Sequence, residues 1–223
     1  MAKKAIKRAP KKKLKTGSNK GNRRKILRWT GIGVLVCFVS VFVIFRFMPI
    51  PTTPFILSEK SRLGSVHSEW MPIDEISDTL KLTVVAAEDV DFCQHWGFDM
   101  SAIRAAIEDG RDRGASTLTQ QVVKNTFLWH GRSWGRKVIE AFLTPLVELF
   151  WSKERILEVY LNVAEFDEGV FGAEAASLHY FGISSDSLTL AEAARLAAIL
   201  PDPKGRSASA PTLFVLHRAD NIQ

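Results

Sequence analysis

The sequence has little cysteine, and its first 28 residues contain no acidic residue. Two cysteines, Cys37 and Cys93, are too few for a disulfide framework. Residues 1–28 hold 13 of the 30 Lys and Arg residues and none of the 24 Asp and Glu residues, so the other 195 residues carry a balance of −7. The basic character therefore belongs to a tail. An acidic body repels a phosphate backbone, which argues against nucleic acid as a partner.

Charge is also absent from residues 29–45, which read WTGIGVLVCFVSVFVIF. This run is long enough for a bilayer, and residues 46–48 extend it, which predicts a transmembrane helix over 29–48. A cleavable signal peptide is the alternative, but small residues would then follow, whereas FRFMPIP follows here. The cations of residues 1–28 predict a cytoplasmic N-terminus on a disordered, solvated tail, and the rest outside.

Pro49, Pro51 and Pro54 favour a stiff, extended connector, which we place at residues 49–64, before a domain at residues 65–223. The domain has no internal repeat, and apolar residues recur at three-to-four spacing, which predicts a mainly helical fold. Four helices are expected: 100–109; 136–151, with a kink or break at Pro145; 153–161, capped by Ser152; and one that begins at a Thr189–Glu192 capping box and stops at Pro201. Loops are expected at 110–116, 131–135 and 167–172.

A first group of polar residues, Glu88 to Asp99, follows an apolar segment directly. A carboxylate at the end of a buried element is partly desolvated, which raises its pKa and makes it a usable general base. The alternative is that Glu88 and Asp89 are only helix-end charges. His95 has no second His or Cys at metal-ligand spacing, so the segment predicts no metal site.

A second group lies at residues 114–125, GASTLTQQVVKN. Its hydroxyls and amides supply neutral donors and acceptors that suit a sugar. Helix capping by Ser116 or Thr117 is the alternative.

The third group is cationic around one acid. Arg136 and Lys137 precede Glu140 by four and three residues, so the three side chains share a face of a helix. Such a cluster could hold a pyrophosphate. A surface ladder of ion pairs is the alternative.

Four motifs in this order resemble those of monofunctional biosynthetic peptidoglycan transglycosylases, which form glycosyltransferase family 51 with the glycosyltransferase domain of class A penicillin-binding proteins. The pattern E-D-x-x-F-x-x-H-x-G-x-D matches residues 88–99, and G-G-S-T-[IL]-T-Q-Q matches 114–121 apart from Ala115. R-K-x-x-E lies at 136–140, and K-x-x-I-L-E-x-Y-L-N at 153–162. Arg218 lies near the family's last basic motif, but that match is loose and assigns it no role.

The resemblance implies an all-α, two-lobed, lysozyme-like domain behind a single transmembrane helix of the inner membrane, with the catalytic domain periplasmic. The implied reaction polymerises lipid II into β-1,4-linked glycan strands, with inversion and release of undecaprenyl pyrophosphate. The implied partners are lipid II, the growing glycan chain, the membrane and cell-wall assembly proteins. No cofactor is obligatory, and a divalent cation, Mg²⁺ or Mn²⁺, is an optional addition at the pyrophosphate.

The resemblance also implies roles for residues. Glu88 would be the general base on the acceptor hydroxyl, and Glu140 the second acid, near the donor phosphates. The implied substrate-binding residues are Ser116, Thr117, Gln120, Gln121, Lys124, Asn125, Arg132, Arg136 and Lys137. No metal ligands are expected.

Two rival functions are open. A lysozyme-like lytic enzyme acting on peptidoglycan also uses a Glu in a helical cleft, but it protonates a leaving oxygen and has no use for a cationic cluster. A non-enzymatic cell-wall scaffold needs none of the motif acids, and all are present.

Overall fold

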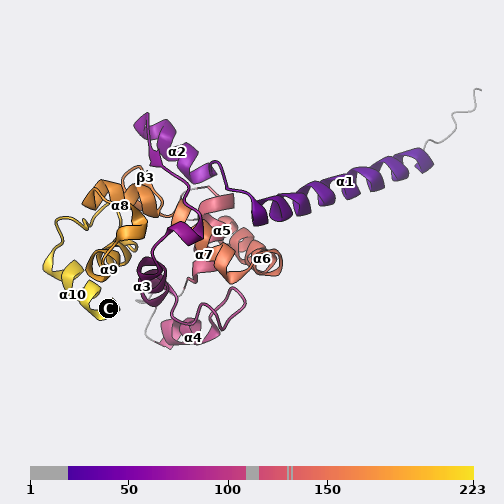
Figure 1. Cartoon of the computed structure of the whole chain (residues 1–223). Coiled ribbons are helices and arrows are strands. Elements are labelled where there is room, and N and C mark those ends of the chain that lie inside the picture. Colours follow the sequence, from indigo (N-terminus) through magenta and orange to yellow (C-terminus); the bar gives the residue numbers. More distant parts are fainter. Residues whose placement is uncertain (1–19, 109–115, 130, 132) are drawn as a thin grey trace, which may run out of the picture. The chain divides into compact units, whose positions relative to one another are not determined.

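The elements of the chain are almost all helical, as Figure 1 shows. The structure is a computed structural model that describes residues 20–108, 116–129, 131 and 133–223, and 66% of it is helix, which confirms the helical class. The α-helices are α1 (Lys20–Phe47), α2 (Pro54–Leu63), α3 (Asp78–Glu88), α4 (Met100–Glu108), α5 (Leu118–Phe127), α6 (Trp134–Phe150), α7 (Lys153–Val163), α8 (Ala173–Phe181), α9 (Leu190–Ile199) and α10 (Leu213–Ile222). The chain divides into a unit that ends at Val41 and a compact unit from Phe42 to Gln223. The two lobes expected within the second unit stay a prediction.

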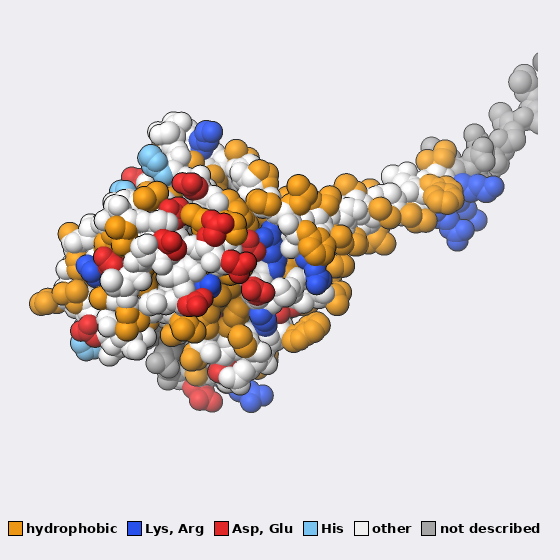
Figure 2. All heavy atoms as spheres, viewed as in Figure 1, with side chains coloured by type: hydrophobic (Ala, Val, Ile, Leu, Met, Phe, Trp, Pro, Cys, Tyr) orange, Lys and Arg blue, Asp and Glu red, His pale blue; other side chains and the backbone are white. Residues whose placement is uncertain are grey.

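Helix α1 contains a stretch, Arg24–Phe47, that is long and apolar enough to cross a membrane. Its apolar side chains are exposed along its length, and Lys and Arg gather at its N-terminal end (Figure 2). The helix begins at Lys20, nine residues before the expected span, because the basic residues that precede the apolar run are themselves good helix formers. Of the tail predicted to be disordered, residues 1–19 lie outside the described residues, and 20–28 are helical.

The last turns of α1 belong to the compact unit and are bonded into it. The indole Nε1 of Trp151 donates to the carbonyl of Phe42 at 2.8 Å, and Arg155 Nε donates to the carbonyl of Phe45 at 3.0 Å. Arg46 donates to the carbonyl of Phe150 at 2.6 Å. The carbonyls of Phe45 and Phe150 lie in the last turns of α1 and α6, where no further turn supplies an N–H donor, so these bonds satisfy them.

The interval expected to be an extended connector instead contains α2. Thr53 caps this helix by accepting from the Ile56 N–H, and Pro54 suits its first turn because its missing N–H is not needed there. Phe55 and Ile56 pack on Phe171, which makes α2 part of the folded unit.

The core of the compact unit forms around α9 and α5. Helices α3 and α10 pack on α9, and α5 packs against both α6 and α7. Four alanines of α9, at 193, 194, 197 and 198, are fully buried, and such small side chains let neighbouring helices approach closely. The expected caps are confirmed, since Ser152 caps α7 and Thr189 forms a capping box with Glu192.

Helix α6 runs through Pro145 without a break. Its buried face is mixed, because Glu140, Thr144 and Glu148 point inward beside Leu143 and Val147. Ile139 and Phe142 are exposed, as are Trp134, Val138 and Leu149. The polar residues of this inward face build part of a site.

A small sheet was not anticipated, because its strands have only two or three residues. It consists of β1 (His67–Ser68), β2 (Glu165–Asp167) and β3 (Val170–Phe171), with β3 in the middle, parallel to β1 and antiparallel to β2. Its β2–β3 turn lies in the expected loop 167–172. Two 3-10 turns, η1 (Ile73–Glu75) and η2 (Ser185–Ser187), complete the described elements.

Candidate active site

Glu88 is the last residue of α3, and its carboxylate is largely buried, with 10% of the side chain exposed. Gln121 Nε2 donates to Glu88 Oε2 at 2.9 Å. Burial raises the pKa of the Glu88 carboxyl; the Gln121 hydrogen bond and the positive charges of Arg218 and Lys124 oppose the rise, and Asp89 adds to it. A carboxylate with a raised pKa is a stronger base, which suits it to accept a proton.

Tyr160 of α7 supports Gln121 from behind. Its hydroxyl points at Gln121 Oε1 at 3.4 Å, which orients the amide so that its NH₂ group faces Glu88. Burial, with the charge of Glu88 adding to it, holds the pKa of Tyr160 well above its usual range, so the phenol stays protonated. Sequence reasoning gave Tyr160 no role, although it lies within the fourth motif.

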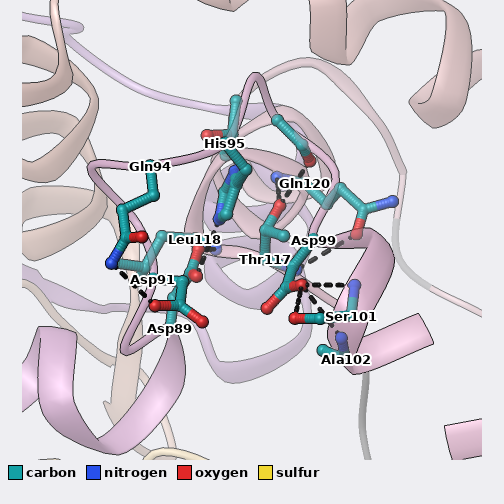
Figure 3. Close-up of polar contacts among 12 residues, drawn as sticks. Asp89, Asp91, Gln94, His95, Asp99, Ser101, Ala102, Thr117, Leu118 and Gln120 are labelled. Carbon is teal, nitrogen blue, oxygen red and sulfur yellow. Dashed lines mark hydrogen bonds and ion pairs between the residues drawn. The ribbon is translucent and has the colours of Figure 1, made fainter. Parts of the chain in front are cut away.

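Asp89 joins the end of α3 to the start of α5 (Figure 3). Its Oδ1 lies 2.8 Å from His95 Nε2, and its Oδ2 accepts from the Leu118 N–H at 2.9 Å. Because a carboxylate only accepts, this contact places a proton on Nε2 of His95. His95 is thus a packed, bonded histidine, and Asp89 fixes where α5 begins relative to Glu88.

The loop before α4 is held by a second buried carboxylate, Glu148 of α6. Glu148 Oε1 accepts from Thr119 at 2.6 Å and from Lys153 at 2.7 Å, and Lys153 also donates to the carbonyl of His95 at 2.7 Å. Gly97 packs beside it, with φ +81°, and a Cβ there would lie 2.5 Å from Thr144 Cγ2. Motif residues Gly97 and Lys153 therefore fix the loop.

The start of α5 uses most of its polar groups for capping. Thr117 accepts from the Gln120 N–H, and the Thr117 N–H donates to Gln120 Oε1 (Figure 3). The Thr117 hydroxyl donates to the carbonyl of Gly97 at 2.7 Å. The capping alternative thus holds for Thr117, whereas Ser116 is exposed. A sugar-binding role for Ser116, Thr117 and Gln120 stays a prediction.

Lys124, one turn after Gln120, is a cation without a hydrogen bond or ion pair to any described residue. It is exposed where it lines the cleft, yet the protein around its ammonium removes part of its hydration, which lowers the pKa of Lys124. The charge of Glu140 opposes that change, and those of Arg136 and Lys137 add to it. A charged, unpaired ammonium is available to an anion.

Glu140 of α6 is 2% exposed and receives a donor on each oxygen. Arg136 donates to Oε2 at 3.0 Å, and Lys137 donates to Oε1. The shared helix face expected from the i+3 and i+4 spacing is confirmed. Arg136 also donates to the carbonyl of Gly131 at 2.8 Å. Arg132 lies outside the described residues.

Two adjoining cavities connect these groups. One, of about 290 Å³, is lined by Gln121, Lys124, Asn125 and Tyr160, among others; the second, of about 420 Å³, is lined by Lys124, Asn125, Trp129 and Arg136, among others. Lys124 and Asn125 line both cavities. A single cleft therefore leads from Gln121, which is bonded to Glu88, to Arg136, which is bonded to Glu140.

The described residues contain no group of three His, Cys, Asp or Glu side chains that could hold a metal ion. Glu140, the acid expected near the phosphates, already accepts from two cations. Its donor set does not fit a divalent cation unless one of them leaves.

Comparisons with known proteins all match one family of proteins. A family model described as transglycosylase matches residues 57–222. A biosynthetic peptidoglycan transglycosylase of Jannaschia sp. (strain CCS1) is 53% identical over 201 residues, which cover 90% of this chain and 83% of the relative. Proteins of the same name from Pseudomonas fluorescens (strain Pf0-1) and Pseudomonas putida (strain W619) are 51% and 49% identical, over 83% and 89% of this chain and 81% and 87% of the relatives.

Proposed function

The chain belongs to the transglycosylase family and is a peptidoglycan glycosyltransferase, and we propose that it polymerises lipid II with Glu88 as the general base. The observation that carries the proposal is the pairing of two groups: a buried carboxylate whose pKa is raised and which is bonded to Gln121 of the cleft wall, and an ammonium in the same wall that has no described partner. The first group can accept a proton, and the second can stabilise a departing anion.

The proposed reaction joins two sugars. Glu88 removes the proton from the 4-hydroxyl of a lipid II acceptor as that oxygen attacks the anomeric carbon of the growing glycan donor. The α-linked undecaprenyl pyrophosphate leaves from the opposite face, which gives a β-1,4 bond. The leaving group already carries negative charge, so it needs cations rather than an acid to protonate it.

Lys124 is the cation we assign to the pyrophosphate, because it is available without breaking an existing ion pair. Arg136 and Lys137 stand beside it, and Glu140 holds them in place. Arg132 and Asn125 are assigned to the same anion as further contacts. Gln121 keeps Glu88 oriented and, from the cavity wall, is placed to contact the acceptor sugar.

We propose that α1 anchors the protein once in the inner membrane, with the catalytic domain in the periplasm. Helix α1 contains a stretch that is long and apolar enough, and 13 Lys and Arg residues precede the uncharged run at residues 29–45. Lipid II is itself a membrane lipid, so an anchored enzyme meets its substrate at a raised effective concentration. We propose cell-wall assembly proteins as further partners of the anchored enzyme.

The test is polymerisation by the full-length protein in detergent or lipid. With labelled lipid II, the wild type should form long glycan strands, and Glu88→Gln should lose about 10²- to 10⁴-fold in rate, the usual contribution of a general base. Glu75→Gln is the matched control, because Glu75 is exposed on η1. Near-normal glycan from a folded Glu88→Gln protein contradicts the base assignment.

A second incubation, with finished peptidoglycan, separates synthesis from lysis. Release of soluble muropeptides by the wild type would favour the lytic alternative. We expect none.

A further inference from the structure

Arg218 reaches the general base from the other end of the chain. It lies on α10, whose Val215 and Ala219 are buried, in a helix that packs on α9 and on α3. This packing brings the guanidinium to the C-terminal end of α3. One terminal nitrogen lies 3.8 Å from Glu88 Oε1, and 3.4 Å from the carbonyl of Ala87.

The contact with Glu88 is an ion pair but not a hydrogen bond. An N–H···O bond has its heavy atoms at 2.7–3.2 Å, and 3.8 Å is beyond that range. Glu88 Oε1 consequently accepts no hydrogen bond from the described part of the chain, whereas Oε2 is taken by Gln121. Oε1 is the oxygen left for a substrate hydroxyl.

Arg218 is also poorly satisfied for a half-buried guanidinium, whose side chain is 33% exposed. Its Nε is buried and has no partner among the described residues, and its one hydrogen bond, to Ala87, is long. Leaving a buried donor unpaired costs free energy, so packing alone does not account for an arginine here.

We propose that Arg218 is the positioning residue of Glu88: it holds the carboxylate ionised by its charge while leaving Oε1 free to take the proton of the acceptor sugar. The inference rests on the proposed function, since it assigns Arg218 a task only if Glu88 is the base. It connects the C-terminal helix, which sequence reasoning left without a role, to the chemistry at the end of α3.

The groups that face Glu88 define what a titration should report. Lys124 comes from α5, Arg218 from α10, Tyr160 from α7, and Asp89 is the next residue in the chain. An arginine keeps its charge at all working pH values. The pKa of the Glu88 carboxyl is raised by burial and lowered by Arg218, so removing Arg218 should raise it further.

The experiment compares pH profiles of kcat/KM for lipid II polymerisation by the full-length wild type, Arg218→Gln and Arg218→Lys. An opposite charge within about 4–6 Å lowers a carboxyl pKa by 1–3 units, and this long, partly solvated contact is at the weak end of that effect. We expect the acidic limb to move up by about one pH unit in Arg218→Gln. Arg218→Lys, which keeps the charge, should restore most of the shift.

Arg195→Gln is the matched control. Arg195 lies on α9 and, like Arg218, donates to backbone carbonyls, those of Ala191 and Ala208. Its profile should coincide with that of the wild type. A loss in Arg218→Gln that is equal at every pH, or no change at all, overturns the proposal in favour of a structural role or none.

The Glu88→Gln background separates the two proposals. There, Arg218→Gln should cause no further loss of residual activity, because its effect passes through the carboxylate; an additional loss overturns the role of Arg218. Full activity of Glu88→Gln alone overturns the proposed base instead. If Arg218→Gln does not fold, the pH profile of Arg218→Lys is the test. A lysine is shorter than an arginine, so its charge lies farther from Glu88, and the acidic limb of kcat/KM should still move upward by a smaller amount.

Discussion

Glu88 and Glu140 are two buried glutamates whose hydrogen-bond partners line one cleft, and these partners differ in kind. Glu140 receives a cationic donor on each oxygen, so both of its oxygens are occupied. Among the described residues, Glu88 receives one neutral amide on Oε2 and only a distant guanidinium near Oε1. A carboxylate that is saturated by donors holds other groups in place, whereas one with a free oxygen can react.

The largest effect should come from replacing Glu140, the glutamate whose two oxygens both accept from cations. Glu140→Gln leaves Arg136 and Lys137 without their counter-charge, and removal of one member of a buried ion pair destabilises by about 3 kcal/mol. We expect Tm to fall by roughly 10 °C, with loss of polymerisation. Glu154→Gln, at an exposed glutamate of α7, should leave Tm within a degree or so. An unchanged Tm for Glu140→Gln would mean that the two cations do not depend on it.

Lys124 tests whether an unpaired cation differs from a paired one. Lys124→Met should lower kcat/KM for the glycan donor by about 10²-fold, the usual cost of losing one group that stabilises developing charge. Lys137→Met removes a cation that already has a partner and should cost less. Steady-state kinetics with varied donor decide this. Equal losses would remove the distinction, and unchanged donor kinetics for Lys124→Met would take it out of the phosphate site.

A smaller effect is expected on the stability of the folded protein when Glu88 is replaced. Burial raises the pKa of Glu88, so the folded protein prefers its neutral form, and ionised Glu88 costs stability at neutral pH. Glu88→Gln should therefore be more stable than the wild type at pH 7, on the order of 1 kcal/mol, as is common when a desolvated functional group is replaced.

The stability difference between Glu88→Gln and the wild type should change with pH. As the pH falls through the raised pKa of Glu88 and then below the ordinary value for a glutamate, the carboxyl becomes neutral in both the folded and the unfolded protein. The advantage of Glu88→Gln should shrink over this range. Melting curves of both proteins from neutral to acid pH measure it, and an advantage that grows in acid would contradict the direction of the shift.

Local sequence signals predicted the helices and caps well. Ser152 and Thr189 were placed from short-range patterns, because a cap depends only on the residues within one turn of it. The pairing of Glu140 with Arg136 and Lys137 follows from helical spacing in the same way. Helix α2 and the small sheet escaped prediction, since their stability comes from contacts with distant residues such as Phe171.

Long-range contacts also explain what the site analysis missed. Tyr160 reaches Gln121, and Arg218 reaches Glu88, only through the tertiary packing of α7 and α10, and no spacing in the sequence reports this. The buried polar side chains of α6 depend on such contacts too. Glu148 is buried there because it accepts hydrogen bonds from Thr119 of α5 and Lys153 of α7.

The bonds between the last turns of α1 and the compact unit bear on how a soluble enzyme could be made. Trp151 and Arg155 donate to carbonyls of Phe42, Phe45 and Met48, and the Phe42 side chain is 2% exposed. A truncation at the prolines after residue 48 would therefore leave the donors of Trp151 and Arg155 without their acceptors and expose the core to solvent. A shortened protein should start at Phe42, so that the anchor is discarded but its final turns, which serve as part of the catalytic body, are kept.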